Sequence, residues 1–150
     1  MIDSMVDNII FSRSWQDSEF FQIQVECISD LITVRGEIYS SSDYIDDLVR
    51  TINLFLIENV NGICWQNGTK GDDSTSCMAL TFYRKDDLGH ISIEVYMEID
   101  DGGRLCKHNC CFYVNTEYGL LYQFRDNLQK LKVPKLGDKV SLIDSCATAI

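Results

Sequence analysis

The sequence is short of proline, histidine and basic residues, and it has no long apolar run. With one proline, 45% hydrophobic residues and 11% aromatic residues, the composition is typical of a folded chain and not of a disordered one. No apolar run approaches the roughly 18 residues that a membrane-spanning helix needs. The first ten residues, MIDSMVDNII, lack the basic segment of a secretory signal. We therefore expect a cytoplasmic protein.

Basic residues are outnumbered by acids, and the imbalance is uneven along the chain. Thirteen lysines and arginines face 23 acids, which gives a net charge of −10. Residues 1–103 hold 19 acids and 6 bases, whereas residues 104–150 hold 4 acids and 7 bases. Such a chain is repelled by nucleic acid, but its field steers a basic partner toward it. Acidity that serves solubility alone is the other interpretation.

The seven cysteines are an odd number and do not form repeated spaced pairs. A disulfide framework is expected mainly in short secreted chains. Five of the cysteines lie in apolar stretches, where a free thiol behaves as a small hydrophobe. We expect reduced cysteines that are mostly buried.

One segment, LCKHNCC at residues 105–111, places Cys106, His108, Cys110 and Cys111 within six positions. On a strand, side chains that share a face stand about 6.8 Å apart, and Cys106 and Cys110 about 13 Å apart. Zinc ligands must approach one another within about 4 Å, and a C-x2-C knuckle is absent. The segment therefore favours an ordinary strand, with Cys110 buried and His108 near the strand's start. A small metal-binding protein centred on Cys106–Cys111 stays as an alternative.

Hydrophobic periodicity predicts the elements. Alternation predicts strands at 20–28, 31–39, 62–67, 76–84, 90–99 and 106–115, with weaker strand signals at 6–11 and in KVSLI. Helical spacing of Ile45, Leu48, Val49, Ile52 and Phe55 predicts a helix that begins at an N-cap, Ser42. Thr116 is predicted to cap a second helix with Leu121, Phe124, Leu128 and Leu131 on its buried stripe.

These elements predict an α+β fold with the order β-β-α-β-β-β-β-α. Short hairpin turns make neighbouring strands antiparallel, and amphipathic helices need an apolar sheet face to cover. We expect a single curved antiparallel sheet of about six strands with two helices packed on one side. Residues 1–150 are predicted to form a single domain, with 1–5 and 140–150 loosely packed.

No enzyme signature is present in the sequence. The Cys–His pairs of the 105–111 segment lack an oriented base and an oxyanion site. Paired aspartates lie in turn-like contexts, where aspartate is common for backbone reasons. The glycine-containing segments lack the strand-to-helix setting of a phosphate loop. We predict a protein that is not an enzyme, with no catalytic residue, cofactor or metal.

Residues 86–101 contain six acids and no lysine or arginine. An acidic strand face that carries a tyrosine is typical of a binding surface, although a solvated face is an equal alternative. We predict that this hairpin binds a basic partner, and Asp43, Asp46 and Asp47 are candidates to join it. The predicted partner-binding residues are Asp86, Asp87, Glu94, Tyr96, Glu98, Asp100 and Asp101.

The segment FYVNTEYGLLYQFRDNLQKL (Phe112 to Leu131), with the hairpin and helix at 20–58, resembles bacterial immunity proteins of the WapI type and of contact-dependent inhibition systems. The resemblance is architectural, and it implies a cytoplasmic antitoxin that binds a cognate toxin domain, often a basic nuclease, and neutralises it. It transfers no site residue. An acidic chaperone for a secreted effector is an alternative, although such chaperones usually begin with a helix.

Overall fold

The computed structural model describes residues 7–17, 19–71, 75–102, 107–133 and 137–143. Along the chain the elements are β1 (Asn8–Gln16), β2 (Phe21–Ile28), β3 (Thr33–Ser40), α1 (Ser42–Leu56), β4 (Ile63–Asn67), β5 (Met78–Arg84), β6 (His90–Asp100), β7 (Lys107–Glu117), α2 (Tyr118–Asn127), the 3₁₀ helix η1 (Leu128–Lys132) and β8 (Lys139–Ser141). Within these residues no helix is long and apolar enough to span a membrane.

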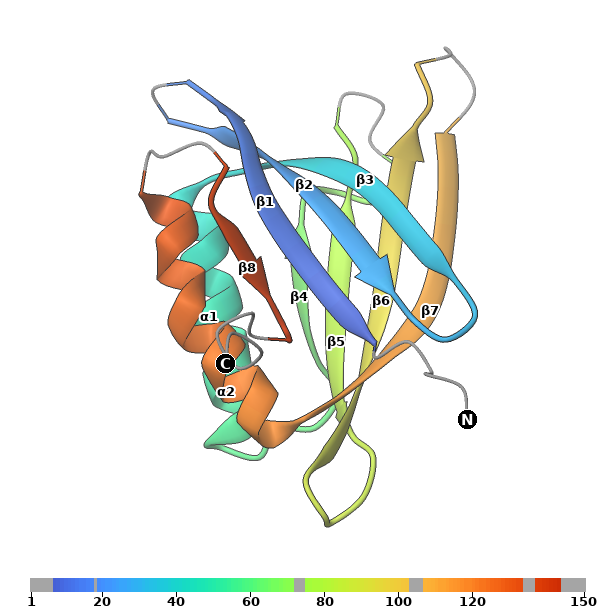
Figure 1. Ribbon diagram of the computed structural model, residues 1–150, viewed down its shortest axis with the longest axis vertical. Helices are drawn as coiled ribbons and strands as arrows, with labels where there is room; N and C mark the ends of the chain where they lie inside the picture. Colours follow the sequence, from blue (N-terminus) through green and yellow to red (C-terminus); the bar gives the residue numbers. More distant parts are fainter. Residues whose placement is uncertain (1–6, 18, 72–74, 103–106, 134–136, 144–150) are drawn as a thin grey trace, which may run out of the picture.

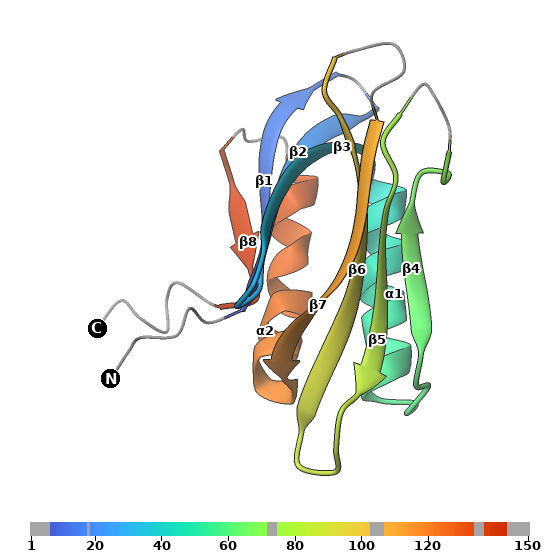
Figure 2. The same ribbon diagram turned by 90° about the vertical axis from the view of Figure 1, so that its right-hand side faces the viewer.

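The strands form two antiparallel sheets, and the prediction of one curved sheet of about six strands was wrong in this respect. Sheet 1 has the order β3-β2-β1-β8, and sheet 2 has the order β4-β5-β6-β7. The two sheets face each other, and both helices lie along one side of them (Figures 1 and 2). Strands β1–β3 and β4–β7 are two runs of consecutive antiparallel strands with α1 between them, and β8, from the end of the chain, joins the first run beside β1. The α+β class was therefore predicted correctly, whereas the number of sheets was not.

Alternation along each strand explains why the core lies between the sheets. In β2, Phe21, Ile23, Val25 and Cys27 are all buried, and the side chains between them are not. In β6, the residues from Ile91 to Met97 alternate in the same way. Every second side chain of a strand points to the same face, so each sheet has one apolar face. Burying these faces against each other and against the helices removes them from water, at about 25 cal/mol per Å².

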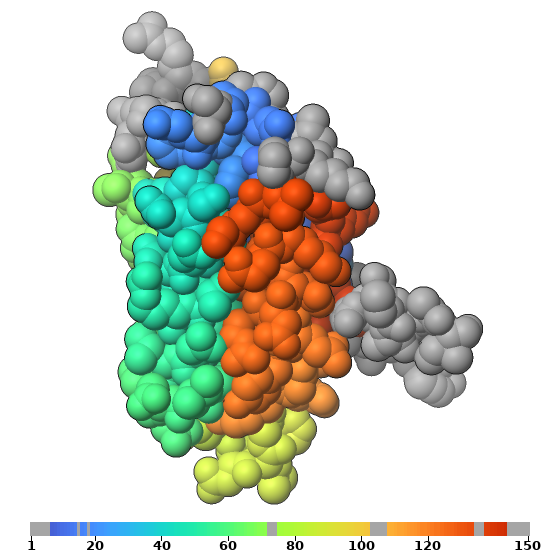
Figure 3. Space-filling view, turned by 90° about the vertical axis from the view of Figure 1, so that its left-hand side faces the viewer, coloured from blue at the N-terminus to red at the C-terminus, as the bar shows by residue number. Residues whose placement is uncertain are grey.

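The helices cover the side on which the two sheets lie open. The predicted stripes are correct: the buried side chains include Ile45, Leu48, Ile52 and Phe55 on α1 and Leu121, Phe124, Leu128 and Leu131 on α2 and η1. Figure 3 shows the two helices side by side over this face. Both predicted caps are displaced. Ser41 caps α1 and accepts a hydrogen bond from the Tyr44 N–H, and α2 begins after Glu117, which makes no side-chain cap.

The two sheets approach each other most closely where β3 crosses β6. A Cβ atom on Gly36 would lie 2.9 Å from the Met97 Cε atom, closer than side-chain atoms pack. The Met97 methyl group is the flexible end of its side chain and could move, but a Cβ atom would also lie 4.0 Å from the Glu98 carbonyl oxygen, so β3 passes close to the β6 backbone here.

The first and last strands lie side by side, although they come from the two ends of the described chain. The weak strand signal at 6–11 corresponds to β1, and KVSLI contains β8, which pairs with β1 through Phe11 and Val140. Val140 and Leu142 are buried, so residues 140–143 follow the strand signal of KVSLI and not the alternative of loose packing. Residues 1–5 and 144–150 lie outside the described residues.

Candidate functional site

The segment that looked chemical in the sequence forms the start of an edge strand. Cys106 lies outside the described residues, and His108 is the second residue of β7, as predicted. The His108 Nε2 atom lies 3.0 Å from the Asp101 Oδ2 atom. Cys110 points toward the core but is only half-buried, whereas Cys111 points the other way and is exposed. Among the residues described, no three His, Cys, Asp or Glu side chains converge on a common point.

The candidate site is the outer face of sheet 2, on the side of β6 and β7 away from the core. Glu94, Tyr96 and Glu98 alternate along β6 and point outward. Strand register places Tyr113 opposite Glu94 and Cys111 opposite Tyr96. Sequence reasoning did not place Cys111 or Tyr113 among the partner-binding residues, although the alternation of 106–115 already put them on the polar side of their strand.

Glu94 is at the centre of this face and bonds to both of its neighbours on β7. Its Oε2 atom accepts a hydrogen bond from the Tyr113 hydroxyl at 3.1 Å and lies 3.6 Å from the Cys111 Sγ atom. The carboxylate raises the pKa of Tyr113, because the tyrosine hydroxyl donates to it. Burial first, and then Glu94, raise the pKa of Cys111. The Tyr113 ring itself is 51% exposed, so its position is set by Glu94 while its surface is open to a partner.

Glu98 shares this face, but it is not available to a partner. The side chain is 3% exposed, because the segment between β4 and β5 lies over it. Its carboxylate accepts hydrogen bonds from the Gly71 N–H at 2.9 Å, the Cys77 N–H at 3.1 Å and the Tyr96 hydroxyl at 2.7 Å. Burial, followed by the bond to Glu98, raises the pKa of Tyr96 to about 12. Glu98 therefore holds the β4–β5 segment on the sheet.

The four aspartates of the predicted patch lie at opposite ends of β6. Asp86 and Asp87 belong to the β5–β6 turn, where the Asp86 Oδ2 atom lies 2.7 Å from the His90 Nδ1 atom. Asp100 ends the strand and Asp101 follows it. With about 3.4 Å per residue, the two ends of this 11-residue strand are about 34 Å apart. The seven predicted residues therefore share one hairpin but do not form one compact cluster.

The other predicted candidates lie on a different part of the molecule. Asp43, Asp46 and Asp47 belong to α1, which covers the side between the two sheets (Figure 3). Asp46 accepts a hydrogen bond from the Lys132 ammonium at 2.7 Å, and Asp47 pairs with Arg50. Two of these three carboxylates are thus already bound to cations of the same chain.

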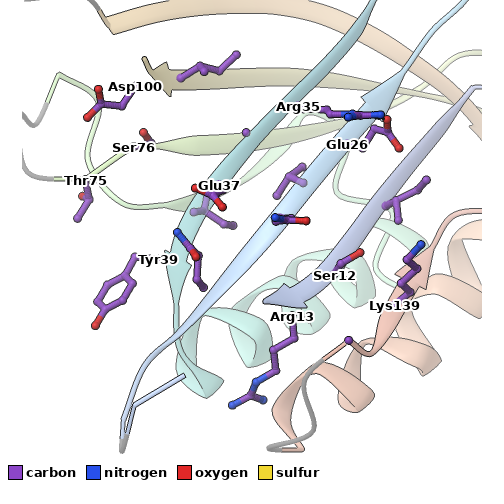
Figure 4. A pocket seen from close by; sticks show the side chains of 18 residues that line it. Ser12, Arg13, Glu26, Arg35, Glu37, Tyr39, Thr75, Ser76, Asp100 and Lys139 are labelled. Atoms are coloured by element: carbon purple, nitrogen blue, oxygen red, sulfur yellow. Dashed lines mark hydrogen bonds and ion pairs between the residues drawn. The ribbon is translucent and has the colours of Figure 1, made fainter. Parts of the chain in front are cut away.

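A broad groove of about 1010 Å³ lies over the outer face of sheet 1. Its floor comes from the polar side chains of β1–β3, and Thr75, Ser76 and Asp100 form one wall (Figure 4). Cations and anions balance here, because Arg35 bonds to Glu26 at 2.9 Å and Lys139 lies across the sheet from Glu37. The sequence showed this face only as the polar half of two alternating strands. Its mixed charge selects no ligand class.

Comparisons of the chain with models of protein families, with curated proteins and with solved structures found no significant match. The site must therefore be interpreted from its own geometry.

Proposed function

We propose that this protein is a non-catalytic immunity protein of the cytoplasm, which binds a cognate toxin domain with a basic surface and neutralises it. The Glu94–Tyr113 pair on the outer face of sheet 2 is the observation that supports binding to a protein. Tyrosine is enriched at protein interfaces, and here its hydroxyl is already held by a carboxylate. Little side-chain freedom is lost when a partner covers such a ring.

The charge of the chain supports a basic partner. The net charge is −10, and Glu94 and Asp101 lie on or beside the outer face of sheet 2. A partner with positive charge associates faster with such a surface and is held in one orientation by it. The identity of the partner as a toxin domain is supported by the resemblance of residues 112–131 to immunity proteins.

The size of an ordinary interface limits which of the predicted residues can take part. A standard interface covers about 800 Å² of each partner, a patch about 30 Å across. A patch of this size that includes Glu94 and Tyr113 can also include one end of β6, but not both ends. We place the Asp101 end in the interface, because Asp101 contacts β7 through His108, and we place Asp86 and Asp87 outside it.

Two double variants with the same change of net charge test this proposal. The first, Glu94→Lys with Asp101→Lys, reverses charge within the proposed interface. The second, Glu58→Lys with Asp87→Lys, reverses two exposed acids outside it and serves as the control. The binding probe is the toxin domain that this proposal predicts in the neighbouring reading frame, inactivated in its catalytic residues. Rescue of cell growth from the active domain is the functional readout.

We expect the interface variant to lower the association rate constant at least tenfold, to flatten its dependence on salt and to lose rescue. The control should change the association rate much less, since only long-range attraction is reduced. Equal effects of the two variants would move the interface elsewhere on the molecule. A wild-type chain that neither binds the domain nor restores growth would refute the proposed function.

A further inference from the structure

Within the described residues, no strand pairs with the outer edge of β7, which ends sheet 2. In an antiparallel pair, the N–H and C=O of one residue point to the same neighbour, and those of the next residue point away. The Glu98 N–H donates to the Cys77 carbonyl at 3.0 Å. The backbone N–H and C=O groups of even-numbered β6 residues therefore point toward β5. The odd-numbered residues of β6 therefore face β7, where register pairs them with Cys110, Phe112 and Val114.

The same alternation makes the backbone of residues 109, 111, 113 and 115 point away from β6. Asn115 confirms this direction, because its N–H donates outward to the Asp7 Oδ2 atom at 2.8 Å. For Asn109, Cys111 and Tyr113, no outward hydrogen bond is found within the described residues. Figure 1 shows β7 at the margin of sheet 2, on the side of β6 away from β5. Six backbone donors and acceptors are thus available in a row.

The other sheet edges are covered, short or charged, as natural edges usually are. The edge strand β4 packs against α1, and the Trp65 Nε1–H donates to the Tyr44 carbonyl at 2.9 Å. The edge strand β8 has three residues. On β3, the outward-facing positions carry the exposed charges of Arg35 and Glu37.

Strand β7 has none of these protections along its middle. The sequence HNCCFYVNT, residues 108–116, contains no lysine, arginine, acid, proline or glycine, and its pairing with β6 has no bulge. Cysteine, phenylalanine, tyrosine and valine suit a strand well. A long regular edge of this kind associates with another strand unless something else prevents it. Its composition therefore favours a specific interface.

We propose that the partner docks by adding an extended segment of its own to the outer edge of β7, with main-chain hydrogen bonds at Asn109, Cys111 and Tyr113. This inference rests on the proposed function and specifies how the toxin domain is held. In strand addition, the backbone bonds provide affinity and alternate side chains provide specificity. Here Cys111 and Tyr113 are the exposed side chains that flank the added strand.

Charge complementarity identifies the added strand as a basic one and not as a second copy of this chain. Three carboxylates contact β7 along its length: Asp101 at His108, Glu94 at Tyr113, and Asp7 at Asn115. Two cations lie near these carboxylates: Lys85 donates to the Asn115 Oδ1 atom at 3.3 Å, and the Lys70 ammonium lies 4.5 Å from the centre of the Tyr96 ring. A second copy would bring the same three carboxylates and a further net charge of −10.

A proline at position 111 tests the outer edge of β7 without disturbing the pairing of β7 with β6. The Cys111 N–H points away from β6, so Cys111→Pro removes no bond of the β6–β7 ladder, and proline is tolerated at such edge positions. The proline does remove one outward donor, and its ring blocks an approaching strand. Cys111→Thr is the matched control, because it changes the same side chain but keeps the N–H and the preference for a strand.

Binding of the same inactivated toxin domain is then measured for the full-length chain and for both variants. We expect Cys111→Pro to bind at least tenfold more weakly than Cys111→Thr, because both variants lose the cysteine side chain and only the proline variant loses the outward N–H. The two variants should have similar melting temperatures. If the proline variant does not fold, amide hydrogen exchange of the wild type provides the answer. Saturation with the domain should slow exchange at Asn109, Cys111 and Tyr113 at least a hundredfold.

The outcomes distinguish this inference from the function on which it rests. Tight binding that leaves these three amides unprotected, or that survives Cys111→Pro, would overturn strand addition while the proposed function stands. An unliganded wild-type chain that dimerises through this edge, and becomes monomeric in the proline variant, would also overturn it, because the occupant would be a second copy. No binding by the wild type would refute the function itself.

Discussion

Replacing Glu98 by glutamine tests whether its buried carboxylate holds the β4–β5 segment on sheet 2. Glutamine has the same shape, but one of its terminal atoms is a donor. The Gly71 N–H bonds to one carboxylate oxygen and the Cys77 N–H to the other, so either orientation of the amide leaves one backbone N–H facing a donor. The Tyr96 hydroxyl can turn to accept. At least one hydrogen bond to a charged group is lost, which costs about 2 kcal/mol.

Chemical denaturation should therefore give a free energy of unfolding about 2 kcal/mol lower for Glu98→Gln. For a chain of this size the melting temperature should fall by about 4–8 °C. Amide exchange at Gly71 and Cys77 should accelerate in the variant, because these two N–H groups lose their acceptor. Global stability and local exchange are thus read on the same sample.

Glu94→Gln is the matched control for this experiment. The substitution is the same and lies on the same face of the same strand, four residues earlier. The Glu94 side chain is half-exposed, so water can replace its bond to Tyr113, and we expect a change within about 0.5 kcal/mol. Equal losses of stability in the two variants would show that burial beneath the β4–β5 segment contributes nothing, and would refute the reasoning.

Two further predictions concern titration and thiol reactivity. In an alkaline titration followed by tyrosine absorbance, one ring should ionise near pH 12, and Tyr96→Phe should remove that phase, because burial and Glu98 raise the pKa of Tyr96 to about 12. Because the pKa is raised in the folded state, the neutral phenol contributes its full stability below pH 10 and loses this contribution as the pH rises toward 12. The contribution of Tyr96 to the free energy of unfolding should therefore be the same at pH 8 and at pH 9. Iodoacetamide at pH 8, followed by mass spectrometry, should label Cys111 more slowly than its exposure alone suggests, since burial and Glu94 raise its pKa and the thiolate is the reactive form. Glu94→Gln should accelerate that labelling, and an unchanged rate would contradict the contact between the two side chains.

Local pattern was enough to predict most of the elements. The alternation at 20–28, 31–39 and 90–99 and the helical stripes were correct, because the face that a residue occupies depends on its neighbours along the chain. Strand β1 was the weak case. Its alternating positions are Ile9, Phe11 and Arg13, and all three are buried, so an arginine interrupts the apolar pattern.

The reason for that arginine lies far away in the sequence. The Arg13 guanidinium donates hydrogen bonds to the carbonyls of Leu131 and Val133, at the end of η1, and it lies 4.0 Å from the centre of the Phe21 ring. A buried charge is tolerated when it is bonded in this way. No local pattern predicts such a partner 118 residues away.

At the candidate site, too, the sequence predicted the face of each residue but not its contacts. Alternation placed Glu94, Tyr96 and Glu98 on one face, and the structure agrees with that placement. The alternation could not show that Glu98 is covered while Glu94 remains accessible, because the β4–β5 segment that covers Glu98 comes some 20 residues earlier in the sequence. Nor could it show that Tyr113 lies opposite Glu94, since register between two strands is a property of the pair.

The sequence by itself determined the α+β class, the positions of most strands and helices, and the strand character of the segment around His108 and Cys110. All of these depend on the period of side chains along one stretch of backbone. Only the tertiary structure decided that the strands form two sheets, which approach each other at Gly36 and Met97, and that no strand of the described residues pairs with β7 beside Glu94. Those features arise from contacts between residues distant in sequence, whose geometry no local period encodes.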